Sequence, residues 1–149
     1  MGLLRDTERG VDATASRPQP TLGDLDGLLE EERAAGARIT VRSDLDDRDA
    51  LPLSTGRNAY RILEEGLTNA RKHAPHAAVT VELAGRPGTG LDLTVRNPLR
   101  VGGEDHGTGL AGFGIIGLAE RAAASHGRFQ HGIVGDGDFV LRAWLPWDP

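Results

Sequence analysis

The chain has 149 residues, a formal net charge of −5 and no cysteine. This length predicts one domain with a core of its own; the acidic balance argues against a nucleic-acid partner, and the absence of cysteine excludes disulfides and thiolate metal sites. No apolar run reaches the length of a membrane span and the N-terminus is too polar for a signal peptide, so we expect a cytoplasmic location and no membrane contact from this domain.

The N-terminal stretch is predicted to lie outside the main domain. Residues 1–20 begin with a short apolar segment, continue with polar and small residues, and end in Pro-Gln-Pro. This pattern is typical of the end of an upstream domain followed by a linker. Residues 21–149 are expected to form the domain itself.

The domain opens with a predicted helix followed by a strand. Leucines recur at helical spacing over Leu22–Leu29, Thr21 offers an N-cap, and Gly36 stands where a terminating glycine is expected. The alternating, β-branched sequence of residues 38–42 predicts a strand. The polar run over residues 44–49 predicts a loop.

The strongest pattern in the chain is the segment Tyr60–Ala74, YRILEEGLTNARKHA. We expect it to be a helix capped by Ser54 or Thr55, with its apolar residues in one arc. A row of polar side chains follows one edge of that arc. Its members are Arg61, Glu65, Asn69 and Lys72, with His73 just inside the edge.

Two members of this row are unusual for a helix surface. Asn69 is a poor choice for a helix interior, because asparagine competes for backbone hydrogen bonds. Lys72 is the only lysine among 17 basic residues, which favours a site that needs a compact ammonium rather than a planar guanidinium. An ordinary amphipathic helix with a polar rim is the alternative, but we favour an edge that binds a ligand.

The second half of the chain is predicted to hold two hairpins and one more helix. Asn97-Pro98 is expected to break the second strand of the first hairpin, and Gly127 to close the helix. The predicted elements are strands at 78–83 and 91–95, a helix over 115–126, and strands at 128–134 and 139–145. Three helices and five mostly antiparallel strands predict a two-layer α/β sandwich, in which a mixed sheet carries the helices on one face.

Two further features could contribute to a binding site. The glycines of residues 102–114 would let the backbone pass close to a ligand, and the helix start that follows suits anionic oxygen. A flexible surface loop is an equal alternative, and the pattern is neither a P-loop nor a Rossmann fingerprint. Asn97 would face the cleft from a strand end, unless it only starts an Asn-Pro turn.

In chain order, the sequence resembles the ATP-binding catalytic domain of bacterial two-component sensor histidine kinases, which has the Bergerat ATPase fold. The resemblance is carried by YRILEEGLTNARKHA, VTVEL, VRNP, GTGLAGFGIIGLAER and FVLRAWLP. It covers about Leu22–Pro146 and is greatest to the subfamily of nitrate and lipid-fluidity sensors. Gly2–Arg5 is similar to the end of the helical phosphotransfer domain that precedes this domain in the family.

The resemblance implies a site for ATP and Mg²⁺. Asn69 would coordinate the metal that bridges the phosphates, and Glu65 would act as the catalytic residue that holds the metal's water or polarises the attack. Lys72 and His73 would meet phosphate oxygens, and Asn97 would face the adenine. A glycine-hinged lid and the amides that open the third helix would complete the site through Gly107, Thr108, Gly109, Gly112, Gly114 and Ile115.

The chain departs from the family pattern in two places. Where the family has Asp-x-Gly-x-Gly, residues 97–101 read Asn-Pro-Leu-Arg-Val. An amide replaces the acid that receives the adenine amino group and both glycines are missing, so we expect weak but adenine-selective binding. None of the five histidines lies directly before an acidic residue in an upstream helix, so we do not expect the chain to phosphorylate itself by the family's route.

The resemblance implies a kinase domain that transfers the γ-phosphoryl group of ATP to a histidine on a dimeric helical dimerisation and phosphotransfer domain. That domain would then pass the group to a response regulator. Two alternatives stay open. One is a serine kinase of the anti-sigma-factor type on the same fold, and the other is a non-catalytic interaction domain that binds nucleotide poorly or not at all.

Overall fold

A computed structural model describes residues 19–98, 116–135 and 137–148. The strands are β1 (Arg38–Leu45), β2 (Ala78–Arg86), β3 (Gly90–Pro98), β4 (Arg128–Val134) and β5 (Asp138–Leu145). The helices are α2 (Leu25–Ala34), α3 (Leu53–His73) and α5 (Ile116–Ala124), with short 3₁₀ turns η1 (Leu22–Asp24) and η2 (Arg48–Ala50).

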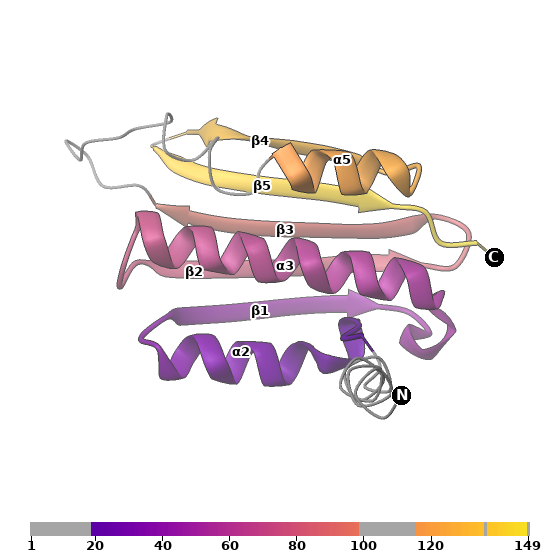
Figure 1. Ribbon diagram of the computed structural model, residues 1–149, viewed down its shortest axis with the longest axis horizontal. Coiled ribbons are helices and arrows are strands. Elements are labelled where there is room, and N and C mark those ends of the chain that lie inside the picture. The colour runs from indigo at the N-terminus through magenta and orange to yellow at the C-terminus, as the bar shows by residue number, and fades with distance from the viewer. Residues whose placement is uncertain (1–18, 99–115, 136, 149) are drawn as a thin grey trace, which may run out of the picture.

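These elements form two layers (Figure 1). The five strands make one sheet in the order β1-β2-β3-β5-β4. β1 pairs with β2 in parallel, and the other three neighbouring pairs are antiparallel. The helices cover one face, so the predicted α/β sandwich is confirmed.

The first helix begins and ends as its sequence predicts. The Thr21 hydroxyl accepts a hydrogen bond from the Gly23 amide at 3.2 Å, and the Asp24 carboxylate accepts one from the Thr21 amide at 2.9 Å. This reciprocal pair is a capping box. At the other end Gly36 has φ +104°, a left-handed conformation that glycine adopts without steric cost.

α3 packs along the middle of the sheet. Its apolar arc is buried, with Ile62, Leu63 and Leu67 at most 2% exposed. Gly66 allows the helix to approach β3 closely, because a Cβ at this position would lie 3.2 Å from Val95 Cγ2. Helix and sheet therefore share one core, and the polar edge of α3 lies at the border of that core.

The predicted cap of α3 is wrong. The helix begins earlier, at Leu53, with Pro52 at the N-cap position and no side-chain cap. Ser54 and Thr55 lie inside the first turn, and the Thr55 hydroxyl donates to the Pro146 carbonyl at 3.1 Å. The ring of Pro52 fixes its φ angle, and its extended conformation precedes the first turn of the helix. The Thr55 hydrogen bond connects this first turn to the C-terminal segment.

Two other predicted boundaries are corrected. β3 does not break at Asn97-Pro98, because Asn97 pairs with Phe139 and Pro98 with Asp138 of β5. α5 ends at Ala124, and the left-handed residue beyond it is His126, with φ +63°, rather than Gly127.

Gly127 has a different role at this helix end. Its amide donates to the Ala122 carbonyl at 2.7 Å, which completes a Schellman-type ending. A Cβ at Gly127 would lie 2.3 Å from the Trp144 carbonyl oxygen. Close packing therefore requires the glycine.

β1 and its connection also differ from the prediction. The strand continues to Leu45, and the η2 turn begins inside the segment expected to be an irregular loop and ends one residue beyond it. No helix among the described residues is long and apolar enough to span a bilayer.

The sheet face opposite the helices is polar. Cross-strand ion pairs bridge neighbouring strands on it, which is typical of a solvated sheet face. The pairs are Arg42–Glu82 at 3.6 Å, Arg142–Asp92 at 3.7 Å and Arg96–Asp138 at 2.7 Å.

Candidate functional site

The polar edge of α3 carries four of the predicted site residues on its last turns. Glu65 and His73 are partly exposed, Lys72 is exposed, and Asn69 is only 2% exposed. The Asn69 Nδ2 atom is buried and has no hydrogen-bond partner within the part of the chain that the structure describes. A buried amide left in this state costs about 1–3 kcal/mol, which marks Asn69 as a group suited to a ligand.

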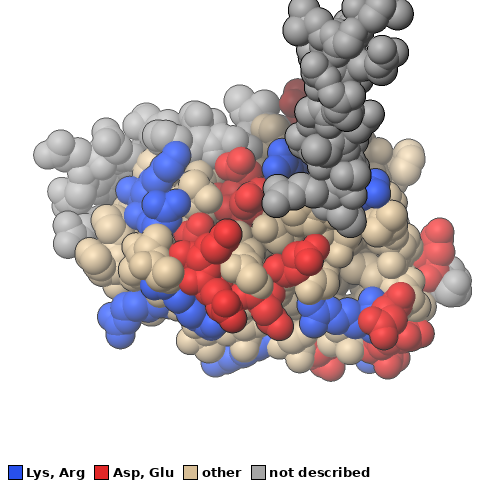
Figure 2. Space-filling view, turned by 60° about the horizontal axis from the view of Figure 1, so that its bottom comes forward, with Lys and Arg blue, Asp and Glu red and all other residues tan. Residues whose placement is uncertain are grey.

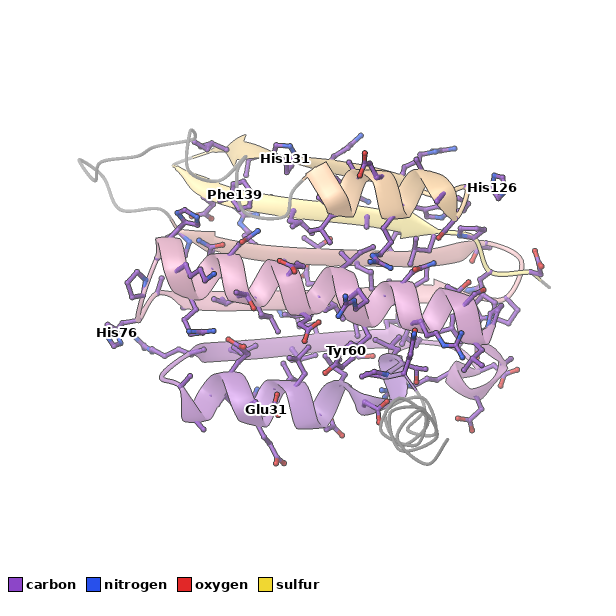
Figure 3. All side chains as sticks on the ribbon, viewed as in Figure 1. Glu31, Tyr60, His76, His126, His131 and Phe139 are labelled. Carbon is purple, nitrogen blue, oxygen red and sulfur yellow. The ribbon has the colours of Figure 1, made fainter. Side chains whose placement is uncertain are left out.

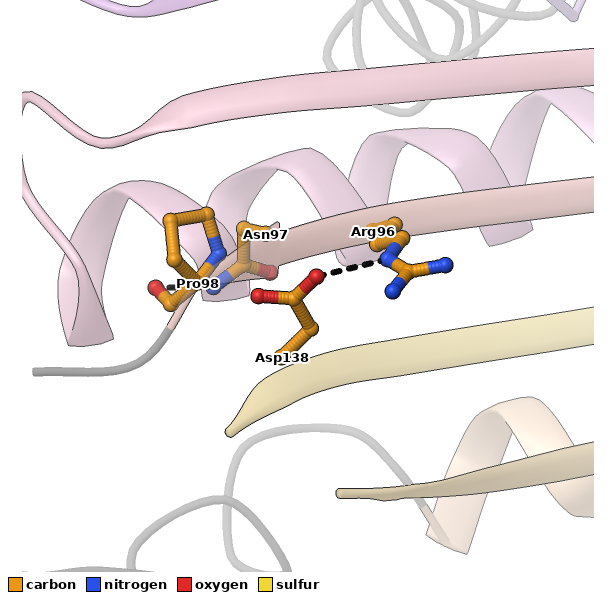
Figure 4. A network of polar contacts seen from close by, with 4 residues as sticks. All are labelled: Arg96, Asn97, Pro98 and Asp138. Atoms are coloured by element: carbon orange, nitrogen blue, oxygen red, sulfur yellow. Dashed lines mark hydrogen bonds and ion pairs between the residues drawn. The ribbon is translucent and has the colours of Figure 1, made fainter. Parts of the chain in front are cut away.

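Asn97 lies at the end of β3 and is also only 2% exposed. Its Nδ2 donates to the carbonyl of the next residue, Pro98, at 3.3 Å (Figure 4). The neighbouring residue Arg96 donates through Nε to the Asp138 carboxylate at 2.7 Å and so ties β3 to the start of β5. The strand end that presents Asn97 is therefore fixed to β5 by sheet pairing and by this ion pair.

The fold brings the α3 edge and the end of β3 to the same end of the molecule (Figure 1). α3 and β3 run in the same direction, and Gly66 packs on Val95. Asn69 follows Gly66 by about one helical turn, and Asn97 follows Val95 by two strand residues. Both steps are about 5–7 Å, so the two amides are level with each other across the layer boundary.

The other predicted ligands lie outside the described residues. These are Gly107, Thr108, Gly109, Gly112, Gly114 and Ile115. Their roles stay predictions.

Phe139 is an aromatic neighbour of Asn97 that the sequence patterns did not indicate. Phe139 pairs directly with Asn97 in the sheet and is 5% exposed. Its ring lies 6.2 Å from that of His131 on β4 (Figure 3). The alternation of β5 could have placed Phe139 on the buried face, but its pairing with Asn97 depends on strand order.

The described residues offer few metal ligands of their own. They contain no group of three or more histidine, aspartate or glutamate side chains that could hold an ion.

Comparisons with known proteins find similarity to sensor histidine kinases. No family model matches the chain. It is 26% identical over 141 residues to the sensor histidine kinase LnrJ of Bacillus subtilis, which covers 94% of this chain and 34% of LnrJ. It is 27% identical over 125 residues to the sensor histidine kinase YxjM of the same organism, covering 82% of this chain and 29% of YxjM. The chain thus spans about a third of these relatives.

Several solved structures with the same fold are histidine kinases. The catalytic domain of histidine kinase ThkA matches with a TM-score of 0.58 at 16% identity, covering 85% of this chain and 94% of that one. The blue-light activated histidine kinase of Erythrobacter litoralis EL346 matches with a TM-score of 0.58 at 18% identity, covering 85% and 45%. The chain is a homologue of the sensor histidine kinases and has the fold of their ATP-binding catalytic domain.

Proposed function

We propose that this domain binds Mg²⁺-ATP at the end of the molecule where α3 and β3 meet, and supplies the γ-phosphoryl group for transfer to a histidine of a separate helical domain. The observation that carries the proposal is the buried Asn69 amide, whose Nδ2 has no partner among the described residues, level with Asn97. A buried polar group without a partner among the described residues is explained by a ligand that satisfies it.

The α3 edge suits the phosphates and their metal. Mg²⁺ prefers oxygen ligands and keeps water and phosphate oxygens in its shell, so one amide oxygen from Asn69 and a carboxylate from Glu65 are a sufficient protein contribution. The Asn69 side chain would present its Oδ1 to the metal, and its buried Nδ2 would donate to a phosphate oxygen of the same ligand. Lys72 and His73, on the next turn, would neutralise phosphate charge.

Asn97 suits the base. Its side-chain hydrogen bond within the described residues uses the Nδ2 donor, so the Oδ1 acceptor is available to an exocyclic amino group. The fixed end of β3 would hold that acceptor in place, and Phe139 beside it offers an aromatic wall. Adenine carries such an amino group and guanine carries a carbonyl at that position, so this acceptor favours ATP over GTP.

The rest of the signalling chain follows from the same proposal. The acceptor histidine would lie on a helical dimerisation and phosphotransfer domain of the same kinase, and a response regulator would receive the group from it. The domain would act in the cytoplasm. Membership of the nitrate and lipid-fluidity sensor subfamily stays a prediction.

A competition titration tests the proposal. A fluorescent ATP analogue is bound to the protein in the presence of Mg²⁺, ATP or GTP is added, and displacement is measured from the change in the fluorescence intensity of the analogue. We expect ATP to displace the analogue and GTP to displace it far less. Equal displacement by both nucleotides would remove the role of Asn97. Absence of analogue binding would leave a non-catalytic interaction domain as the function of this fold.

A further inference from the structure

An open cleft of about 450 Å³ lies at the opposite end of α3 from the candidate nucleotide site. Its walls come from the first half of α3 and from α5, with Gln19 and Pro20 at its border. The side chains that define its chemistry are Ser54, Arg57, Asn58, Arg61 and Arg121. Arg57 is 12 residues before Asn69 on the same helix, or about 18 Å along the axis, so the cleft is a separate place.

The cleft is basic in an acidic protein. Three arginines line it and no lining residue is acidic, although the chain carries a net charge of −5. Acidic side chains instead gather over the surface where α2 lies (Figure 2). The hollow on the open sheet face is different, because its arginines Arg42 and Arg142 are matched by Glu82 and Asp92.

Acidic side chains among the described residues compensate little of the positive charge of the cleft. The Nε atom of Arg57 is buried and has no hydrogen-bond partner within the described ranges. Arg121 has no ion pair with a described acid. Arg61 pairs with Glu64 at 3.3 Å, but both side chains are more than a third exposed, so this pair contributes little.

The three arginines are positioned by two helices, α3 and α5, which hydrogen bonds connect beside the cleft. Arg57 and Arg61 are four residues apart on α3 and so project from the same side of that helix. The Asn58 amide donates to the Ser125 hydroxyl just after α5, and that hydroxyl donates to the Arg121 carbonyl at 3.0 Å. These bonds tie the two helices together beside the cleft and limit how far Arg121 can move from Arg57.

We propose that this cleft binds a phosphate-type oxyanion, either free or carried on a small ligand. Planar guanidinium groups match the geometry of phosphate oxygens and form paired, charge-assisted hydrogen bonds with them. The cleft volume is in the range of small-molecule sites. A bound oxyanion supplies the acceptor that Arg57 Nε lacks among the described residues and neutralises the clustered charge. This site does not depend on nucleotide binding at Asn69.

The test is a titration of the protein with inorganic phosphate and, separately, with pyrophosphate. Binding is monitored by NMR through the chemical shifts of the arginine side-chain Nε–H groups. We expect the signals of Arg57 and Arg121 to shift saturably, while that of Arg142 on the far sheet face stays in place. Arg121→Gln, at an exposed residue, should weaken binding roughly tenfold and leave the backbone spectrum unchanged. Lys72→Ala, at the other end of α3, should leave phosphate binding in the cleft unaltered.

Three results would overturn the proposal. In the first, sodium chloride at equal ionic strength produces the same shifts, which would reduce the effect to screening. In the second, phosphate moves the side-chain signal of Asn69 and not that of Arg57, which would place the anion in the nucleotide site. In the third, only an oligoglutamate peptide shifts the arginine signals, which would assign the cleft to an acidic protein partner.

Discussion

Replacing Asn69 by leucine should stabilise the ligand-free protein and remove the Mg²⁺ dependence of its nucleotide binding. The Nδ2 atom of Asn69 is buried without a partner among the described residues, at a cost of about 1–3 kcal/mol. Leucine is similar in size, removes that cost, and favours the helix by roughly 0.5 kcal/mol over asparagine. Allowing for imperfect packing, we expect a gain in unfolding free energy of about 1–2 kcal/mol, or about 4 °C in Tm for each kcal/mol.

The assay is thermal and urea unfolding without nucleotide, paired with ATP titration of the same variants. Asn58→Leu is the matched control, because Asn58 is on the same helix but its amide donates to the Ser125 hydroxyl. That variant should lose about 1 kcal/mol of stability. A fall in the stability of Asn69→Leu similar to that of the control would mean that the Asn69 amide is satisfied in the free protein, and would refute the reasoning.

Three further predictions concern single positions. Asn97→Asp should tighten ATP binding about fivefold, because a charged acceptor binds the adenine amino group about 1 kcal/mol more strongly, and an unchanged Kd in a titration would contradict it. Burial, followed by the Glu64 charge, raises the pKa of Tyr60 above 10, and Figure 3 places Tyr60 on the side of α3 that faces α2. Stability should then be fully present below pH 10 and fall as the pH rises above it. Tyr60 is the only tyrosine in the sequence. The increase in absorbance at 295 nm that accompanies its ionisation should therefore occur at a higher pH in the native protein than in the urea-unfolded protein. Gly127→Ala should lower the free energy of unfolding by more than about 2 kcal/mol, because its Cβ would meet the Trp144 carbonyl. His126→Gly should raise it by up to about 1 kcal/mol, because glycine adopts the left-handed conformation of this position without steric cost. Urea unfolding that ranks the two variants in the opposite order would contradict this prediction.

Much of the fold follows from local sequence patterns. The leucine spacing after Thr21, the apolar arc of α3 and the alternation of the strands predict the elements and their order, because each pattern reports a face that must be buried. The predicted helix ends are wrong where a contact with a residue distant in the sequence determines the local structure. Thr55 bonds to Pro146 instead of capping its helix, and Trp144 makes Gly127 necessary one position beyond the left-handed residue.

The candidate site divides in the same way. The row containing Glu65 and Asn69 could be predicted because helical spacing alone puts those residues on one edge. The pairing of Asn97 with Phe139 could not, since it depends on β5 lying between β3 and β4. The cleft of Arg57 and Arg121 could not be predicted from the sequence either. These residues are 64 positions apart, and only the packing of α3 with α5 brings them together.

Calorimetric titration with Mg²⁺-ATP tests the central claim most directly. We expect saturable binding to the wild-type domain that weakens when Mg²⁺ is removed. Asn69→Ala should keep the fold but lose the dependence of ATP binding on Mg²⁺. Saturable binding with the same affinity and the same Mg²⁺ dependence in Asn69→Ala, or no heat from the wild type at millimolar ATP, would contradict the claim that the end of α3 is a nucleotide site.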